Sequence, residues 1–301
     1  MTSAKPNQPH DQPDQNIHLL CSCDHKFIKL AAAMLKSAEV NMNPGERLTV
    51  HFMDLGILSR ARKMVIRTLD PDKVQVKWYP VRRPLLRQLE KEMTVMGHPS
   101  FQKMVFTEVL PKSVNKLVYV DVDVLVLSSL QALYVTDLGG KTIGAVQDRA
   151  GTVDCPWAGI PNYAALGIPA KTPYFNAGIM LIDCARWRAG AVTQRVIQIS
   201  RENRPHVRFA EQYGLNVLLR DDWKELDPAW NCGDDQAPQP KLFHFLNRKP
   251  TALDYAGQKG GLFYHYLDQT AWAGWRPKAG SNRLRFLREI IIKKLLVPLG
   301  F

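Results

Sequence analysis

KLVYVDVDVLVL, residues 116–127, predicts an apolar strand interrupted by two carboxylates. Alternation along a strand sends Asp121 and Asp123 to one side and Val122 to the other. The carboxylates repel each other unless a cation or a proton separates them, and charge at the end of an apolar strand needs a reason. A hard divalent ion accepts such oxygen ligands and can bridge to a diphosphate. The stretch therefore predicts a ligand site at the carboxyl end of a strand in an open α/β sheet.

A second Asp-x-Asp triplet, Asp70-Pro71-Asp72, shows that this spacing alone is weak evidence. Such a triplet is expected about once by chance in a chain of this length. Pro71 favours a turn at the second triplet. The apolar strand around Asp121 and Asp123 is the context that favours the first triplet as a site.

The segments around this strand alternate between strand and helix patterns. The patterns predict strands at 17–23, 47–56, 73–81, 142–147 and 175–182. They predict helices at 26–40, 59–69, 101–110, 186–201 and 210–220. This alternation predicts a largely parallel sheet covered by helices, in a nucleotide-binding α/β fold. Residues 227–280 are rich in Pro, Gly, Trp and Tyr, which predicts loops that close over a site.

Composition sets the domain organisation and the classes of partner. The chain has 301 residues, 46% of them hydrophobic, which is enough for a substantial core. Residues 1–16 predict a flexible head, and residues 17–280 a single domain. Lys and Arg number 40 against 28 Asp and Glu, and the net charge of +12 suggests nucleic acid, anionic lipid or phosphorylated ligands as partners. No stretch is long enough to span a bilayer, so we expect a soluble or peripheral protein.

The five cysteines are odd in number and scattered. They are Cys21, Cys23, Cys155, Cys184 and Cys232. No signal-peptide pattern precedes them, which favours free thiols in a reducing cytoplasm. Cys21 and Cys23 lack a second ligand pair at zinc-site spacing, so we expect them to be strand residues.

The tail over residues 281–301 interleaves basic and apolar residues. Its charged residues are Arg283, Arg285, Arg288, Lys293 and Lys294 against Glu289. A basic amphipathic helix of this kind can lie on an anionic membrane surface, here the inner face of the membrane around the cytoplasm. The alternative is a final helix packed on the domain.

Five segments, in order, resemble glycosyltransferase family 8, which includes glycogenin and bacterial lipopolysaccharide galactosyl- and glucosyltransferases. They are HLLCSCDHKF, KLVYVDVDVLVLSSLQALY, PYFNAGIMLIDCARWR, EQYGLN and LFHFLNRKP. The resemblance implies a GT-A fold, a UDP-sugar donor, and Mn²⁺ or Mg²⁺ as the ion. It also implies transfer of glucose or galactose, with xylose as an alternative, to a glycan or lipid-linked acceptor with retention of anomeric configuration.

The resemblance assigns the metal to Asp121, Asp123 and His244. An imidazole beside two carboxylates suits Mn²⁺ better than Mg²⁺, which prefers oxygen ligands. Outside this motif, a lone histidine would more often make a structural hydrogen bond. Lys249 is expected to neutralise a diphosphate leaving group, although on its own it would be a solvated surface lysine.

The same resemblance implies which residues bind the nucleotide and its phosphates. Asp24 matches a position that hydrogen-bonds the uracil, and Phe27 one that stacks on it; a loop aspartate and a core aromatic are the alternatives. Lys103 matches an arginine near the donor sugar and phosphates. The whole predicted set is Cys23, Asp24, Phe27, Lys103, Asp121, Val122, Asp123, His244, Asn247 and Lys249.

The resemblance also implies a catalytic set. Its members are Asp148, Asn176, Glu211, Gln212 and Lys249. Asn176 and Gln212 match positions that line the donor sugar, and Asp148 is expected to hydrogen-bond sugar hydroxyls. Glu211 replaces an aspartate of the family pattern. Because the amide of Gln212 is a poor nucleophile, we expect the acceptor to attack from the face that the phosphate leaves.

Two other functions stay open. The net charge of +12 would suit a nucleic-acid-binding protein, but no recognisable nucleic-acid module is present and no nucleic acid is expected as a partner. In HFLNRKP the His-to-Lys spacing is one residue shorter than in the family, and Asn247 stands near the usual glycine. A UDP-sugar-binding homologue with weak or no turnover is therefore the second alternative.

Overall fold

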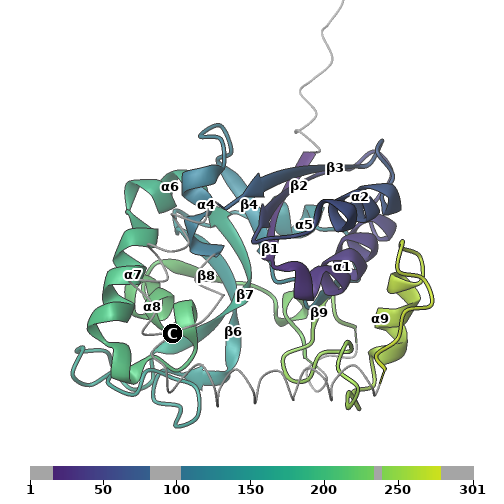
Figure 1. The fold of residues 1–301 in the computed structure, drawn as a ribbon. Coiled ribbons are helices and arrows are strands. Elements are labelled where there is room, and N and C mark those ends of the chain that lie inside the picture. Colours follow the sequence, from purple (N-terminus) through teal and green to yellow (C-terminus); the bar gives the residue numbers. More distant parts are fainter. Residues whose placement is uncertain (1–15, 82–102, 234–238, 279–301) are drawn as a thin grey trace, which may run out of the picture.

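A seven-stranded sheet in the order β3-β2-β1-β4-β7-β6-β8 forms the centre of the molecule (Figure 1). The computed structural model describes residues 16–81, 103–233 and 239–278. The strands of this sheet are β1 (Asn16–Cys23), β2 (Arg47–Asp54), β3 (Val74–Pro80), β4 (Lys116–Val120), β6 (Ile143–Thr152), β7 (Pro173–Asp183) and β8 (Trp223–Glu225). Only β7 runs against the others within this sheet, because it pairs antiparallel with both β4 and β6 while the remaining pairs are parallel. The predicted, largely parallel α/β sheet is confirmed.

Helices cover both faces of the sheet (Figure 1). They are α1 (Ile28–Val40), α2 (Ser59–Thr68), α4 (Phe106–Val109), α5 (Gln131–Tyr134), α6 (Cys184–Ala189), α7 (Val192–Glu202), α8 (Ala210–Leu219) and α9 (Gly260–Leu267), with short 3₁₀ helices η1 (His25–Phe27), η3 (Arg204–His206) and η4 (Pro228–Trp230). In β4, Leu117 and Tyr119 pack with α4 and α6 to α8, whereas Val118 and Val120 pack with α1, α2 and α9. Burial on both faces explains why this strand is apolar throughout.

The stretch 116–127 does not form the single strand that its apolar pattern predicts. The strand β4 ends at Val120, and a turn holds Asp121, Val122 and Asp123. The next strand, β5 (Val124–Val126), pairs antiparallel with β9 (Leu242–His244) in a separate two-stranded sheet. The expectation that strand alternation orients the carboxylates is therefore wrong. The chain turns out of the central sheet between them, and a buried apolar run on either side hides that turn in the sequence.

Three further expectations need correction or refinement. The helix predicted at 186–201 is two helices, because Gly190 ends α6 and Ala191 adopts a left-handed φ of 46°. In the segment 101–110, which is described from residue 103, a 3₁₀ turn at 103–105 leads directly into the short helix α4. The loops predicted over 227–280 contain β9 and α9 as well.

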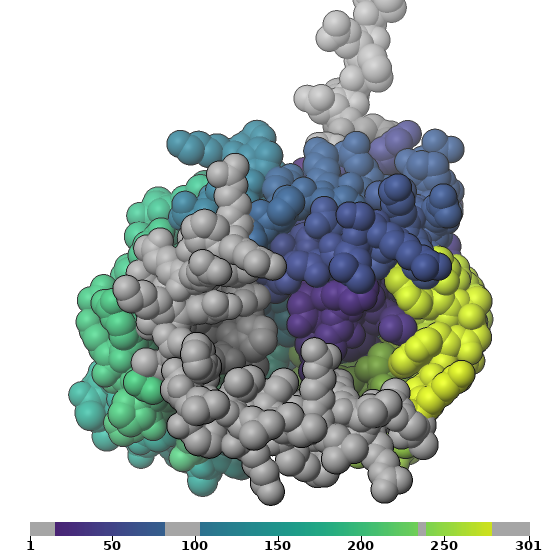
Figure 2. Space-filling view, in the orientation of Figure 1, coloured from purple at the N-terminus to yellow at the C-terminus, as the bar shows by residue number. Residues whose placement is uncertain are grey.

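The helix α9 packs on α1, far from it in sequence. Figure 2 shows α9, in yellow, beside the N-terminal segments in purple and blue. The side-chain amide of Asn41 donates to the hydroxyl of Tyr266 at 3.0 Å. No helix among the described residues is long and apolar enough to cross a membrane.

Other expectations are confirmed. The second Asp-x-Asp triplet lies in a turn before β3, with the backbone N–H of Asp72 donating to the carboxylate of Asp70 at 2.9 Å. All five cysteines are free thiols, and Cys21 and Cys23 belong to β1. Residues 1–15 of the predicted head and the tail helix at 281–301 lie outside the described residues, whereas Asn16, predicted to belong to the head, is the first residue of β1.

The fold gathers polar side chains at one edge of the sheet. The parallel strands β1, β4 and β6 lead to this edge at their carboxyl ends, and the reversed strand β7 begins there. Asp24 follows β1, Asp121 follows β4, and Asn176 lies near the start of β7. This edge is where open α/β sheets bind ligands.

Candidate active site

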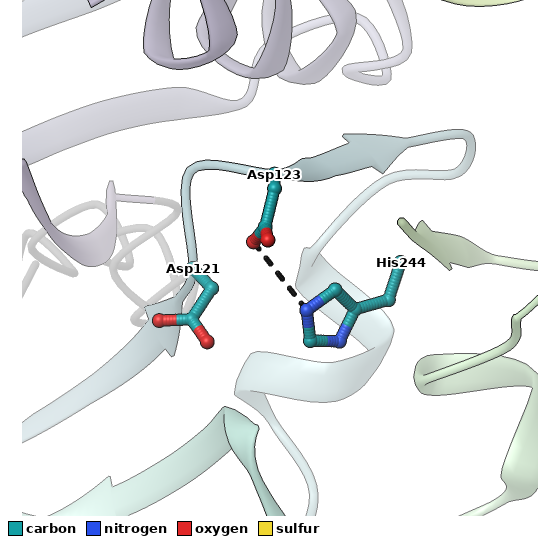
Figure 3. A group of neighbouring side chains, drawn as sticks. All are labelled: Asp121, Asp123 and His244. Atoms are coloured by element: carbon teal, nitrogen blue, oxygen red, sulfur yellow. Dashed lines mark ion pairs between the residues drawn. The ribbon is translucent and has the colours of Figure 1, made fainter. Parts of the chain in front are cut away.

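Asp121, Asp123 and His244 face one another at the junction of the two sheets (Figure 3). One potential ligand atom from each residue lies within 4.8 Å of the other two. Nε2 of His244 is 3.4 Å from Oδ1 of Asp123. The pairing of β5 with β9 creates this approach, because Val124 is the cross-strand partner of His244 and the N–H of Phe245 donates to the carbonyl of Asp123 at 3.0 Å.

The carboxylate of Asp121 has one oxygen occupied by neighbours. Its Oδ1 accepts a short hydrogen bond from the hydroxyl of Tyr119 and lies 3.3 Å from Nζ of Lys103. Burial raises the pKa of Asp121, and the Lys103 cation opposes that rise. Its Oδ2 points toward Gly178 on β7, on the side where His244 lies.

Lys103 is a buried cation between two carboxylates. Its Nζ lies 2.8 Å from Oε1 of Glu211 on α8 and also donates to the carbonyl of Ala177 at 3.2 Å. Burial alone would lower the pKa of Lys103, but the carboxylates of Asp121 and Glu211 raise it above its ordinary value. The lysine therefore stays charged and fixes the orientation of Asp121.

Asp123 is held by a second lysine. Nζ of Lys249 lies 2.5 Å from its Oδ2 and also donates to the carbonyl of Phe245. Burial raises the pKa of Asp123, but His244 and Lys249 together lower it well below its usual range. Asp123 is therefore ionised, which is the state that metal binding requires of a carboxylate.

Gly178 leaves the space in which the three side chains meet. A Cβ at this position would lie 2.4 Å from Cε1 of His244 and 3.0 Å from Oδ2 of Asp121. Any larger residue would displace the imidazole or the carboxylate. The segment FNAG therefore needs its glycine for close approach of β7 to the cluster.

The orientation of His244 depends on its other ring nitrogen. Nδ1 lies 3.0 Å from the side-chain oxygen of Asn231, whose amide nitrogen donates to the oxygen of Asn176 at 2.8 Å. A donor–acceptor partner of this kind fixes the ring and its tautomer, with Nε2 directed at the carboxylates.

A carboxylate and two amides form a second cluster beside the first. Oδ2 of Asp148 accepts from the amide of Asn176 at 2.7 Å and from that of Gln212 at 3.3 Å. The oxygen of Gln212 accepts from the backbone N–H of Ala177 at 2.9 Å. The amide of Gln212 is therefore fixed at both ends, across β6, β7 and α8.

Two pockets, of about 420 and 440 Å³, meet at the acidic pair. Both are lined by Lys103, Asp121, Asp123 and Lys249. The first, which we name the α8 pocket, is also lined by His244, Asp148, Asn176, Glu211 and Gln212. The second, the β1 pocket, is also lined by Cys23, Asp24, Phe27 and Val122. An elongated ligand could thus cross the acidic pair with one end in each pocket.

The β1 pocket combines an aromatic face with a capping aspartate. Phe27 is half-buried, packs against the main core and has Nζ of Lys26 5.0 Å from its ring centre. Oδ1 of Asp24 accepts from the backbone N–H groups of Lys26 and Phe27 at 2.9 and 3.3 Å. Asp24 therefore shapes the turn η1 through Oδ1, as expected of a loop aspartate. Cys23 forms buried wall, and burial raises the pKa of its thiol.

Asn247 is the one predicted residue that lines neither pocket. It is exposed, and its side-chain oxygen lies 3.5 Å from the guanidinium of Arg149. Sequence reasoning also left out residues that build the site or its rim, among them Tyr119, Gly178, Asn231 and Arg149. Gly178 lies inside the segment PYFNAGIMLIDCARWR, so the sequence contained a signal for its steric role. Asn231 had no such signal, because it acts only through its contact with His244.

The donor set fits a divalent cation. Two carboxylates and an imidazole converge, and a glycine keeps the space between them open. Each carboxylate already faces one lysine, so the cluster tolerates negative charge without protonation of Asp123. Mixed oxygen and nitrogen ligands of this kind suit Mn²⁺.

Comparisons with known proteins find similar sequences and structures. The sequence profile of Glycosyl transferase family 8 matches residues 18–253. General stress protein A of Bacillus subtilis (strain 168) is 23% identical over 282 residues, covering 86% of this chain and 96% of that protein. Glycosyltransferase GlyA of Streptococcus pneumoniae serotype 4 is 30% identical over 170 residues, covering 52% of this chain and 22% of that protein. The structure of galactosyltransferase LgtC, in complex with donor and acceptor sugar analogues, matches with a TM-score of 0.73 at 19% identity, covering 85% of this chain and 96% of LgtC. The predicted GT-A architecture is confirmed.

Proposed function

Because this chain belongs to glycosyl transferase family 8, and glycosyl transfer is the function of that family, we propose that it moves a hexose from a UDP-sugar to a glycan or lipid-linked acceptor. A divalent ion, Mn²⁺ in preference to Mg²⁺, would be held by Asp121, Asp123 and His244. The observation that carries the proposal is the meeting of two pockets at this acidic pair, since a nucleotide-sugar has two ends joined by a diphosphate.

In the proposed complex, the β1 pocket takes the uridine. Phe27 offers an aromatic face to the uracil, and Oδ2 of Asp24 is left to accept from the ring N–H because Oδ1 caps η1. Val122 and Cys23 form the apolar wall.

The diphosphate would lie where the two pockets meet. A bound divalent ion supplies positive charge that stabilises the leaving group. Lys249 adds a second positive charge, because its Nζ lies at the pocket junction. Lys103 is a positioning residue instead, since Asp121, Glu211 and a backbone carbonyl occupy its ammonium group.

The donor sugar would occupy the inner part of the α8 pocket, against Asp148, Asn176 and Gln212. The bond between its anomeric carbon and the phosphate oxygen breaks, and the acceptor hydroxyl forms the new bond on the same face. The acceptor proton passes to the departing phosphate. Because the oxygen of Gln212 accepts from Ala177 and its nitrogen donates to Asp148, this amide holds the sugar and does not attack it. Attack from that face would retain the anomeric configuration, and the fixed amide of Gln212 supports this course of the reaction.

The structure of the HFLNRKP loop favours an active enzyme over a UDP-sugar-binding homologue without turnover. Its departure from the family pattern falls at Asn247, which faces solvent and lines neither pocket. Lys249, two residues later, still reaches Asp123 at 2.5 Å. The charge that assists the leaving group therefore survives the change in the loop.

Calorimetric titration with UDP, in Mn²⁺, in Mg²⁺ and in EDTA, tests the proposal. We expect UDP to bind in the presence of metal and to bind weakly in EDTA. UDP release from UDP-glucose, UDP-galactose and UDP-xylose then identifies the donor. No UDP binding in any buffer would contradict the proposal, whereas metal-dependent UDP binding without release from any donor would favour the inactive homologue.

The proposal places the protein in the cytoplasm, with residues 282–301 on the anionic inner face of the membrane, where a lipid-linked acceptor would be found. Five basic residues in this segment support the placement. Deleting 282–301 should reduce sedimentation with vesicles that contain phosphatidylglycerol, and unchanged sedimentation would contradict it.

A further inference from the structure

The outer part of the α8 pocket carries a group of residues that the transfer chemistry does not use. Arg149, Trp157, Arg208 and Phe209 line it on the side away from the β1 pocket. The side chains of Trp157 and Phe209 are large and apolar, yet 56% and 45% exposed. Both arginines are exposed as well. Two exposed aromatic residues beside two cations in one pocket form a surface suited to binding rather than to packing.

Trp157 projects from a loop that is itself fixed. Ala158 and Ile160, which flank Gly159 just after Trp157, are buried, at 1% and 0% exposure. The N–H of Ile160 donates to the carbonyl of Val153 at 2.7 Å, and a Cβ at Gly159 would lie 2.0 Å from that carbonyl. The indole is therefore presented to the pocket by ordered backbone, which lowers the entropy lost when a ligand stacks on it.

Arg208 and Phe209 are presented by a strained segment. The guanidinium of Arg208 donates to the carbonyl of Pro156, which links this segment to the Trp157 loop. Ala210, the next residue along the wall of the pocket, has a φ of 35°, in the left-handed region that alanine rarely adopts. Such strain concentrates where a site must be shaped in a particular way.

The two arginines differ from the lysines deeper in the pocket. Lys103 pairs with Asp121 and Glu211, and Lys249 pairs with Asp123. Among the described residues, no salt bridge is formed by either Arg149 or Arg208. Their positive charge is therefore available to a ligand. Arginine binds carboxylates and phosphates through two parallel hydrogen bonds.

The diphosphate of the donor does not account for these arginines. It would lie at the junction of the pockets, where Asp121, Asp123 and Lys249 are shared, and neither arginine lines the β1 pocket. Resting on the proposed function, we infer that the outer part of the α8 pocket binds an acidic acceptor, a sugar that carries a carboxylate or a phosphate. Its ring stacks on Trp157, and its anionic group pairs with Arg149 and Arg208.

The test measures binding of matched sugars while UDP and Mn²⁺ fill the donor site. Methyl α-galactoside and methyl α-galacturonide differ only in a hydroxymethyl group against a carboxylate, and galactose 6-phosphate supplies the phosphate arm. Saturation-transfer NMR titrations give each affinity. We expect at least one anionic sugar to bind roughly tenfold more tightly than the neutral one, about the effect of one charge-assisted hydrogen bond. Which arm shows the gain tells the carboxylate from the phosphate.

Variants separate the two parts of the surface. Arg208→Ala and Arg149→Ala should each lower the preference for the anionic sugar several-fold, with the control Arg201→Ala, an exposed arginine outside both pockets, leaving the preference unchanged. Trp157→Ala should weaken binding of neutral and anionic sugars alike. Equal affinity for the neutral sugar and both anionic sugars, or an unchanged preference in Arg208→Ala, would overturn the inference. The UDP titration is read separately, so a loss of UDP binding would instead contradict the proposed function on which the inference rests.

Discussion

The chain contains two Asp-x-Asp triplets in opposite surroundings. Asp121 and Asp123 follow a buried strand, and each lies within 3.3 Å of a lysine. Asp70 and Asp72 lie in the turn between α2 and β3, where Asp72 is exposed and Asp70 caps the turn. The residues and their spacing are the same, and only the neighbours differ.

The difference shows which pair of carboxylates would be stabilised by a bound cation. In the exposed turn, water solvates both charges, so the pair needs no cation and gains little from one. At the end of β4, burial removes that solvation, and Lys103 and Lys249 compensate one oxygen of each carboxylate. The remaining oxygens face His244, where a cation would complete the compensation.

The most direct way to break the comparison is to make the same change in both triplets. Asp123→Asn should weaken Mn²⁺-dependent UDP binding by about 100-fold or more, because loss of a ligand exceeds the tenfold to 100-fold cost typical of lost outer partners. Asp72→Asn should leave it unchanged. Calorimetry with UDP and Mn²⁺ measures both, and circular dichroism checks folding. Equal losses in the two variants would show that the triplets do not differ as described.

A methyl group can test the space between the ligands. Gly178→Ala places a Cβ 2.4 Å from the imidazole of His244, so we expect Mn²⁺ affinity to fall by tens of fold. The control is Gly261→Ala in α9, where a Cβ would meet nothing within 4 Å. Electron paramagnetic resonance of free Mn²⁺ gives both affinities. An unaffected Gly178→Ala would mean that the three side chains do not converge on one ion.

The comparison of the two triplets can be extended to the residues that hydrogen-bond to a proposed metal ligand. Asn231→Ala removes the acceptor at Nδ1 of His244, and we expect Mn²⁺ affinity to fall by about tenfold. Asn115→Ala, at an exposed position outside both pockets, is the control. The same resonance titration applies. A wild-type affinity in Asn231→Ala would assign the orientation of His244 to packing alone.

A buried titratable group can also stay uncharged, without a counter-charge beside it. His51 is such a group, and its substitution should give the smallest effect among these predictions. This buried side chain contacts His18 at 2.9 Å and the hydroxyl of Tyr79 at 3.1 Å. Burial, with contributions from His18 and Lys77, lowers its pKa to about 4. The unfolded chain, with the ordinary value of 6.5, then binds more protons than the folded one between these limits. Stability should therefore be full above pH 6.5 and decline as the pH falls toward about 4.

Urea unfolding at pH 7 and pH 5 measures this decline. His51→Asn should make it smaller than in the wild type, while His206→Asn, at an exposed position, should not change it. An equal decline in all three proteins would show that His51 titrates alike in the folded and unfolded chain.

Much of the site could be predicted because its residues lie in short segments that each carry a local signal. Asp121 and Asp123 interrupt an apolar run, and His244 and Lys249 share one segment. The structure brings these four together. Their roles in metal and phosphate binding stay predictions until the titrations above are made.

What the sequence could not predict depends on contacts between distant segments. The break after β4 is hidden because apolar residues stand on both sides of it, and those of β5 are buried in a different sheet. The helix α9 begins with two glycines, which are poor helix formers, and packing on α1 stabilises it instead. Trp157 has no periodic pattern around it, so only the loop geometry shows that it faces the pocket.

The pairing of β5 with β9 also brings together two of the proposed metal ligands, which are far apart in the chain. Between Asp123 and His244 the chain passes through β6, β7 and the helices α6 to α8. A metal ion bound to both residues would act as a removable cross-link that closes this long loop. In the unfolded chain these residues would lie too far apart to bind the ion together, so the ion would stabilise the folded chain. The supply of metal ions would then determine the stability of the folded chain as well as the rate of the proposed reaction.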